Sequence, residues 1–114
     1  MAFNGQLADR VRELIAAATD KSIAEKKMFG GLCFMVDDKM CVGVREEYIM
    51  VRLAPAFFEE ALEKEGCKPM VMGDRVMKGF LYVDDSVLAT KKQLQYWVQK
   101  ALDYNPLAKA SKKK

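Results

Sequence analysis

The sequence predicts an α+β domain whose helices pack on one face of a mainly antiparallel sheet. A nearly continuous strand-forming block spans residues 27–53, an amphipathic stretch precedes it, and a second helix–strand–strand–helix series follows it. We expect five strands in the order α-β-β-β-α-β-β-α. The 114 residues, about half of them hydrophobic, suffice for one compact core. Residues 1–106 are expected to form this domain and residues 107–114 a flexible lysine-rich tail.

Three stretches have the periodicity and the end signals of helices. The first begins at the N-cap candidate Asn4, and its apolar stripe consists of Leu7, Val11, Leu14, Ile15 and Ala18. The second begins at Ala54-Pro55 and ends at Gly66. The third follows a capping box at Thr90 and Gln93 and ends at about Tyr104, before Asn105-Pro106.

The strand-forming stretches lie at residues 25–29, 32–36, 39–45, 45–53, 68–72 and 76–83, which is one stretch more than the five strands of the expected order. Gly30-Gly31 permits a bulge or a tight bend, and Asp37-Asp38 and Glu46-Glu47 are the expected hairpin turns. Pro69 has no N–H group to donate to a neighbouring strand, which indicates that its strand lies at a sheet edge.

Two-residue turns in these hairpins would give the sheet two unlike faces, because side chains alternate along a strand. The face expected to meet the core carries Cys33, Met35, Met40, Val42, Val44, Ile49, Val51 and Leu53. The other face mixes apolar and charged residues, and five of them form the candidate partner surface: Phe34, Cys41, Tyr48, Met50 and Arg52. Cys33 and Cys41 then lie on opposite faces, so no disulfide between them is expected.

Composition argues against several classes of function. The chain has no histidine, so the usual general base and the commonest metal ligand are both missing. The three cysteines contain no CxxC pair and follow no secretory segment, which favours a reducing cytoplasm. No apolar run approaches the ~20 residues that span a bilayer. We expect no enzyme activity, cofactor or metal site, although Cys41 or Cys67 could be reactive.

The net charge of +3 comes largely from the C-terminal end. Four lysines lie within residues 109–114, so the rest of the chain is close to neutral. Positive charge confined to a tail is weak support for nucleic-acid binding by the folded domain.

Two short motifs, together with the opening helix, resemble the N-terminal domain of the TfoX (Sxy) family of competence regulators. The matching residues are Lys27, Met28, Phe29, Gly30 and Gly31 in one motif, and Met77, Lys78, Gly79 and Phe80 in the other. The resemblance implies a compact α+β domain and a regulatory role in bacteria. Longer members add a C-terminal domain with helical character, so this chain is expected to be a stand-alone member. The family implies no catalytic residues.

The motif glycines and aromatic residues are best explained by close packing within a sheet. Lys27 and Lys78 leave two alternatives open. Their aliphatic stems could lie along the sheet with the amines in water, or the two strands could lie close and form a basic patch that binds a phosphate or an acidic partner.

These observations favour a non-enzymatic regulatory or protein-interaction module that forms a homodimer or binds a protein partner through the mixed sheet face. The alternative is a nucleic-acid-binding protein that uses basic strand residues and the lysine tail. A third and weaker hypothesis is an enzyme that uses Lys27 or Lys78. No membrane role is expected.

Overall fold

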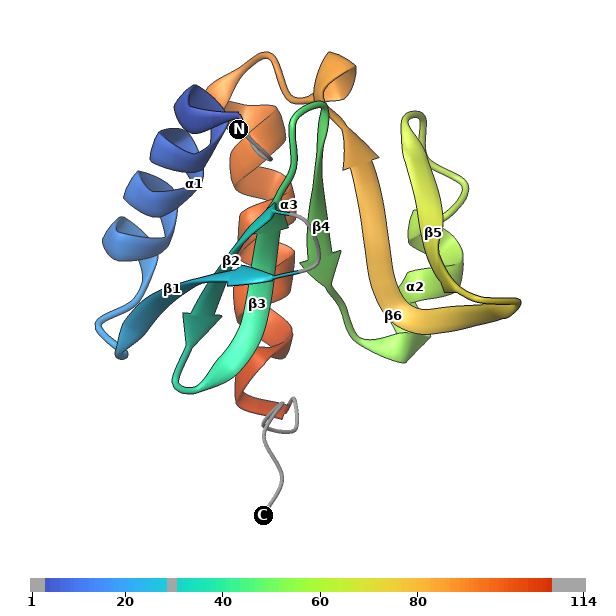
Figure 1. The fold of residues 1–114 in the computed structure, drawn as a ribbon, viewed down its shortest axis with the longest axis horizontal. Helices are drawn as coiled ribbons and strands as arrows, with labels where there is room; N and C mark the ends of the chain where they lie inside the picture. The colour runs from blue at the N-terminus through green and yellow to red at the C-terminus, as the bar shows by residue number, and fades with distance from the viewer. Residues whose placement is uncertain (1–3, 29–30, 108–114) are drawn as a thin grey trace.

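The computed structural model of the protein describes residues 4–28 and 31–107, which form three helices and six strands (Figure 1). The elements follow in the order α1 (Gly5–Ala18), β1 (Ile23–Met28), β2 (Gly31–Val36), β3 (Lys39–Val44), β4 (Tyr48–Arg52), α2 (Pro55–Ala61), β5 (Cys67–Met72), β6 (Arg75–Asp84) and α3 (Lys91–Tyr104). Short 3₁₀ turns follow β6 and α3, at Asp85–Val87 and Asn105–Leu107.

The expected α+β class is confirmed, but the expected strand number and order are wrong. The sheet has six strands, in the spatial order β1-β2-β3-β4-β6-β5, and each neighbouring pair is antiparallel. Four strands, not three, precede α2, because the chain reverses three times before that helix. The first reversal lies between Met28 and Gly31, which are directly opposite each other across β1 and β2. The expected bend at Gly30 itself falls outside the described residues.

The predicted ends of α1 and α3 and the predicted start of α2 are confirmed, but the predicted end of α2 at Gly66 is wrong. The Asn4 side chain accepts a hydrogen bond from the N–H of Leu7 at 3.1 Å and caps α1. At α3 the full capping box is present, since Thr90 and Gln93 each bond the other's backbone N–H. The helix α2 is shorter than expected, and a turn connects its end at Ala61 to β5.

The three helices pack on one face of the sheet, where one main core forms. Buried residues of α1, α2 and α3 join those of β2, β3, β4 and β6 in a single apolar cluster. Its largest fully buried side chains are Phe34, Phe58, Ile15, Ile49, Leu53, Leu81, Leu88 and Leu94. In Figure 1, α3 runs behind β2 and β3.

The face assignment of the second strand was wrong, and a β-bulge explains the error. Near the Asp37-Asp38 turn the pairing is as expected, with Met35 opposite Met40, but the register then shifts and Phe34 lies opposite Val42. Cys41 is the extra residue, and both Cys41 and Val42 reach the main core.

The bulge inverts the expected sides of β2. Phe34 is fully buried beneath the helices, whereas Cys33, Met35 and Met40 lie on the opposite face. The assignments of Val42, Val44, Ile49, Val51 and Leu53 to the core are confirmed.

Two motif glycines have a steric explanation in the sheet. A Cβ atom on Gly31 would lie 2.3 Å from the carbonyl oxygen of Val44, a backbone atom that cannot move aside cheaply. Gly79 has φ +92, and its Cβ would lie 3.1 Å from the carbonyl oxygen of Leu53. These positions therefore require glycine for close strand packing.

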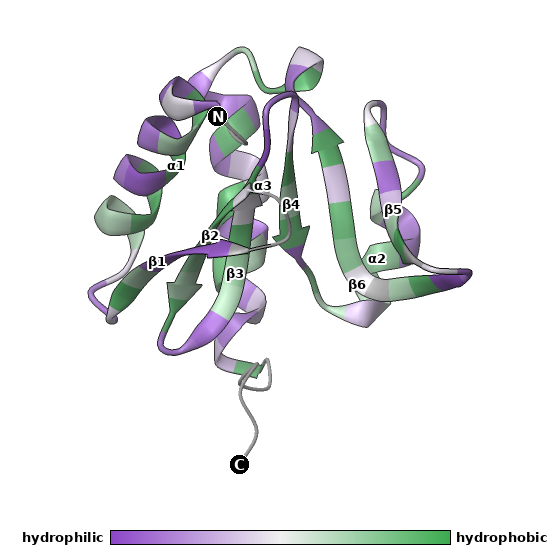
Figure 2. Ribbon diagram, viewed as in Figure 1, coloured by the Kyte–Doolittle hydropathy of each residue, from purple (hydrophilic) through white to green (hydrophobic). Residues whose placement is uncertain are grey.

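The two edge strands differ in character. Pro69 lies in β5, which is an edge strand as predicted. The opposite edge strand, β1, exposes the charged residues Glu25, Lys26 and Lys27. Figure 2 shows this hydrophilic stretch of β1, whereas the inner strands β4 and β6 are mostly hydrophobic. Charged side chains at a sheet edge oppose unwanted strand pairing.

Candidate interaction surface

The sheet face opposite the helices, called the uncovered face below, is organised around one row of side chains. The strand pairings place its members directly beside one another, because opposite residues of paired strands project to the same side. The row reads Lys26, Cys33, Gly43, Met50, Tyr82 and Lys68, from one edge of the sheet to the other.

A thioether-rich layer fills the middle of the uncovered face. Met35, Met40, Met50 and Met70 are each no more than 5% exposed and cluster with Cys33. Methionine side chains are long and flexible, so they cover one another without help from a helix. Gly43 leaves a hollow of about 10 Å³ beside them, the size of a single water molecule.

Aromatic and arginine side chains border this layer on β4 and β6. The rings of Tyr48 and Tyr82 lie 4.6 Å apart between centroids, and Arg45 lies over Tyr48 at 5.4 Å. Arg52 lies over the ring of its cross-strand neighbour Phe80, also at 5.4 Å. Tyr48, Arg52, Phe80 and Tyr82 are all partly exposed, so they are available to a partner.

Positive charge predominates around the row. Lys26 and Lys68 lie at its two ends, and Arg45 and Arg52 flank its centre. A negative charge comes from Asp84, which lies opposite Tyr48 in the β4–β6 pairing. Hydrogen bonds from Ser86, and secondarily the charge of Lys68, lower the pKa of Asp84. Asp84 is therefore ionised at neutral pH, and the charges of Lys26, Lys68 and Arg52 together still exceed it.

The cysteines are protonated thiols rather than activated nucleophiles. Burial raises the pKa of Cys33 to about 11 and that of Cys41 to about 12, and Arg52 offsets only part of the shift at Cys41. Burial also raises the pKa of Cys67, against a smaller opposite effect of Lys64. Nucleophilic cysteines need the opposite shift. All three are free, and Cys33 and Cys41 lie on opposite faces as predicted, although on exchanged sides.

The two motif lysines do not lie on neighbouring strands. Lys27 is an exposed residue of β1, and Lys78 belongs to β6, with β2, β3 and β4 between those strands. The side chains of Met28 and Lys78, like the whole of Phe29 and Gly30, fall outside the described part of the chain. The basic patch that required adjacent motif strands therefore has no support in the sheet order.

The structure brings together three of the five residues predicted for the partner surface. Tyr48, Met50 and Arg52 alternate along β4 on the uncovered face, with Met50 as part of its buried layer. Phe34 and Cys41 lie in the main core and are corrections to the prediction.

Two residues that were not predicted for the partner surface, Phe80 and Tyr82 of β6, lie on the uncovered face instead. The sequence signal for them was the alternation of aromatic residues along β6, but only the pairing of β6 with β4 reveals that they adjoin Tyr48 and Arg52.

Other kinds of site find no support in the described residues. No group of three or more histidine, cysteine, aspartate or glutamate side chains lies close enough to hold a metal ion within that part of the chain. None of the helices between residues 4 and 107 is both long and apolar enough for a transmembrane span.

Residues 13–104 match the family model of the TfoX N-terminal domain. The chain therefore belongs to the TfoX N-terminal domain family, as the two motifs predicted. Comparison with curated proteins and with solved structures gave no significant match.

Proposed function

We propose that this domain is a regulatory protein-interaction module and that its uncovered face binds an acidic, partly apolar segment of a partner protein. The observation that carries the proposal is the group of aromatic and arginine side chains on β4 and β6, namely Tyr48, Arg52, Phe80 and Tyr82. Positive charge predominates around this group. Family membership supports a regulatory role resembling that of the N-terminal domain of bacterial competence regulators.

The composition of this face fits protein recognition. Tyrosine, phenylalanine, methionine and arginine are enriched in protein interfaces, and tyrosine and arginine are prominent among the residues that dominate binding energy. Tyr82 and Phe80 offer apolar contact area, while the guanidinium of Arg52 is placed to meet a carboxylate. The buried methionines beneath them provide an apolar floor.

Electrostatics favours a different chain over a second copy of this one. Two identical faces would bring Arg45, Arg52 and the flanking lysines of each copy toward those of the other, which costs free energy. An acidic partner instead gains attraction from the same charges, and the attraction weakens as salt screens it.

The test uses a short fluorescent peptide that mixes glutamate with leucine and tyrosine, and a version in which lysine replaces glutamate. Anisotropy titrations should show binding of the acidic peptide alone. Arg52→Glu should weaken it at least about tenfold, because a repulsive contact replaces an attractive one. Lys21→Glu makes the same charge change at an exposed position in the turn before β1 and should leave the affinity unchanged.

Two outcomes would overturn the proposal. One is equal affinity for the acidic and lysine peptides. The other is binding that survives Arg52→Glu while circular dichroism shows a native fold. Light scattering tests whether the uncovered face instead forms a homodimer. If the unmodified protein is a salt-resistant dimer and Tyr82→Glu is a monomer, this face binds a second copy of the chain.

A further inference from the structure

A groove on the helix side of the molecule lies between the first turns of α3 and the turn that follows α2. Its volume is about 520 Å³, and it is shallow and widely open to solvent, so it suits an extended ligand that lies along the surface. Its lining consists of Lys64, Glu65, Val87, Lys92, Gln93, Tyr96 and Trp97. It shares no lining residue with the uncovered face, and it would need its own ligand.

One stripe of α3 supplies the chemistry of this groove. Lys92, Tyr96 and Lys100 follow one another at four-residue spacing, which places them on the same side of the helix. The ammonium groups of Lys64 and Lys100 lie 5.4 and 5.5 Å from the centroid of the Tyr96 ring. Lys100 also lies 4.9 Å from the ring of Phe57.

The stripe has the features of a stacking platform. Tyr96 is 38% exposed, unusually high for a large hydrophobic side chain of this protein, while Trp97 is 5% exposed and meets it edge-on at 5.0 Å. Trp97 thus fixes the position of the Tyr96 ring, and the ammonium groups of Lys64 and Lys100 lie over that ring. A base that stacks on Tyr96 displaces these ammonium groups from the ring, and they can then meet the neighbouring phosphates.

The lysines around the ring are not neutralised by carboxylates. Both ion pairs formed among residues 4–28 and 31–107 belong to Arg12 of α1, which does not line the groove. Glu65 is the acidic residue in the groove lining, against Lys64 and Lys92, with Lys100 adjacent. Lys92 and Lys100 are separated by eight residues, roughly 12 Å along the helix. The platform is therefore cationic over a length that a short chain of phosphates can follow.

We propose that this groove binds single-stranded nucleic acid, with one base stacked on Tyr96 and the neighbouring phosphates held by Lys64, Lys92 and Lys100. An aromatic ring within a positively charged groove is the usual arrangement for such strands, because every base has a stacking face and every step carries a phosphate. A duplex keeps its bases stacked inside, so it can reach the lysines but not the ring. This site is independent of the proposed protein-binding face.

The test measures anisotropy of a fluorescent oligothymidylate with the full chain at several salt concentrations. Tyr96→Ala should weaken binding about ten- to a hundredfold, whereas Tyr96→Phe should retain it, since stacking needs the ring and not the hydroxyl. Lys64→Gln and Lys100→Gln should each lower the slope of log affinity against log salt by about one.

Lys91→Gln is the matched control. Lys91 is the neighbour of Lys92 but lines a different cleft, beside Arg10 and Glu13 of α1. Because every variant keeps the C-terminal lysines, the general attraction of that segment is the same throughout. Lys91→Gln should therefore bind as the unmodified protein does, apart from the small loss expected for a distant charge.

Three results would overturn the inference: no oligothymidylate binding at low salt, equal loss with Lys91→Gln and Lys64→Gln, or full binding by Tyr96→Ala. If heparin or duplex DNA displaced the fluorescent oligothymidylate as well as an unlabelled single strand does, the site would bind polyanions in general. This result would also overturn the inference. Arg52→Glu should leave oligothymidylate binding intact, so failure here and failure of the peptide test are distinguishable.

Discussion

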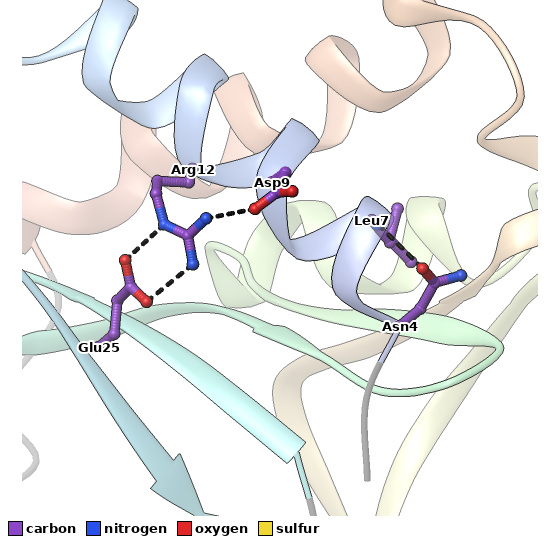
Figure 3. Close-up of polar contacts among 5 residues, drawn as sticks. All are labelled: Asn4, Leu7, Asp9, Arg12 and Glu25. Atoms are coloured by element: carbon purple, nitrogen blue, oxygen red, sulfur yellow. Dashed lines mark hydrogen bonds and ion pairs between the residues drawn. The ribbon is translucent and has the colours of Figure 1, made fainter. Parts of the chain in front are cut away.

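At the scale of single residues, Arg12 connects the first helix to the edge of the sheet (Figure 3). Its Nε and Nη2 atoms donate to the two carboxylate oxygens of Glu25 on β1 at 2.6 and 2.9 Å, and Nη1 donates to Asp9 at 2.6 Å. The guanidinium also lies 5.6 Å from the ring centroid of Phe34. Hydrogen bonding to Arg12 lowers the pKa of Glu25 despite an opposing effect of burial.

This pair makes a pH-dependent contribution to stability. The folded state lowers the pKa of Glu25, so the contribution is present above the unfolded pKa and is lost as pH falls through the folded pKa. Glu25→Gln should lower the free energy of unfolding by roughly 0.5 kcal/mol near neutral pH, since both side chains are more than a third exposed. The difference should vanish in acid.

Urea denaturation of both proteins across this pH range measures the effect. Glu63→Gln, at an exposed position outside the two ion pairs of residues 4–28 and 31–107, is the control. A Glu25→Gln cost that stays constant into strong acid would show that the pair contributes nothing through charge.

Asn105 has two roles, of which the sequence predicts only the first. The sequence predicts that it ends the last helix, and α3 does end at Tyr104. Its side chain is also buried, and Nδ2 donates to the carbonyl oxygen of Val36 at 3.1 Å. Asn105 therefore attaches the end of α3 to the end of β2, a contact 69 residues apart along the chain.

At the scale of elements, the bulge in β3 decides which face each strand residue occupies. Phe34 and Phe80 make a matched pair for testing this arrangement. Phe34→Ala should lower the free energy of unfolding by about 3–5 kcal/mol, because it removes a fully buried ring from the main core. Phe80→Ala should cost clearly less, since its ring is partly exposed on the uncovered face.

Chemical denaturation of the two variants gives the comparison. Unchanged m-values would show that the same amount of surface is exposed on unfolding in both variants. Equal costs would contradict the assignment of these rings to opposite faces. A larger cost for Phe80→Ala would reverse it.

At the scale of the whole molecule, Arg10 connects the first helix to the segment that precedes the last helix. Its Nη2 atom donates to the carbonyl oxygens of Leu88, Ala89 and Thr90 at 2.8, 3.4 and 3.3 Å. These carbonyls lie immediately before α3, so one side chain of α1 positions the beginning of the last helix. The layer of helices over the sheet depends on this contact as well as on apolar packing.

Arg10→Ala should therefore lower the free energy of unfolding by about 1–2 kcal/mol, because the lost hydrogen bonds involve a charged donor and a partly buried acceptor. Arg75→Ala, at the exposed tip of the β5–β6 hairpin, should stay within roughly 0.5 kcal/mol of the unmodified protein. Thermal unfolding of both variants checks the difference, and an Arg10→Ala midpoint equal to that of Arg75→Ala would contradict the role of Arg10.

The sequence by itself determined what local physics controls: the presence of three helices, the N-caps of α1 and α3, the edge position of Pro69, the turn at Asp37-Asp38, and the two motifs of the family. Capping, proline geometry and apolar periodicity act over a few residues, so they can be read along the chain.

Only the tertiary structure decided the sheet order, the faces of β2, and the surfaces available to partners. A single extra residue at Cys41 exchanges the two sides of a strand, and no local signal marks it. Phe80 and Tyr82 join Tyr48 and Arg52 because β6 pairs with β4, and Lys64 meets Tyr96 because α2 and α3 share one face of the sheet. These contacts join residues far apart in the chain, and the free energy that selects them comes from packing the whole core.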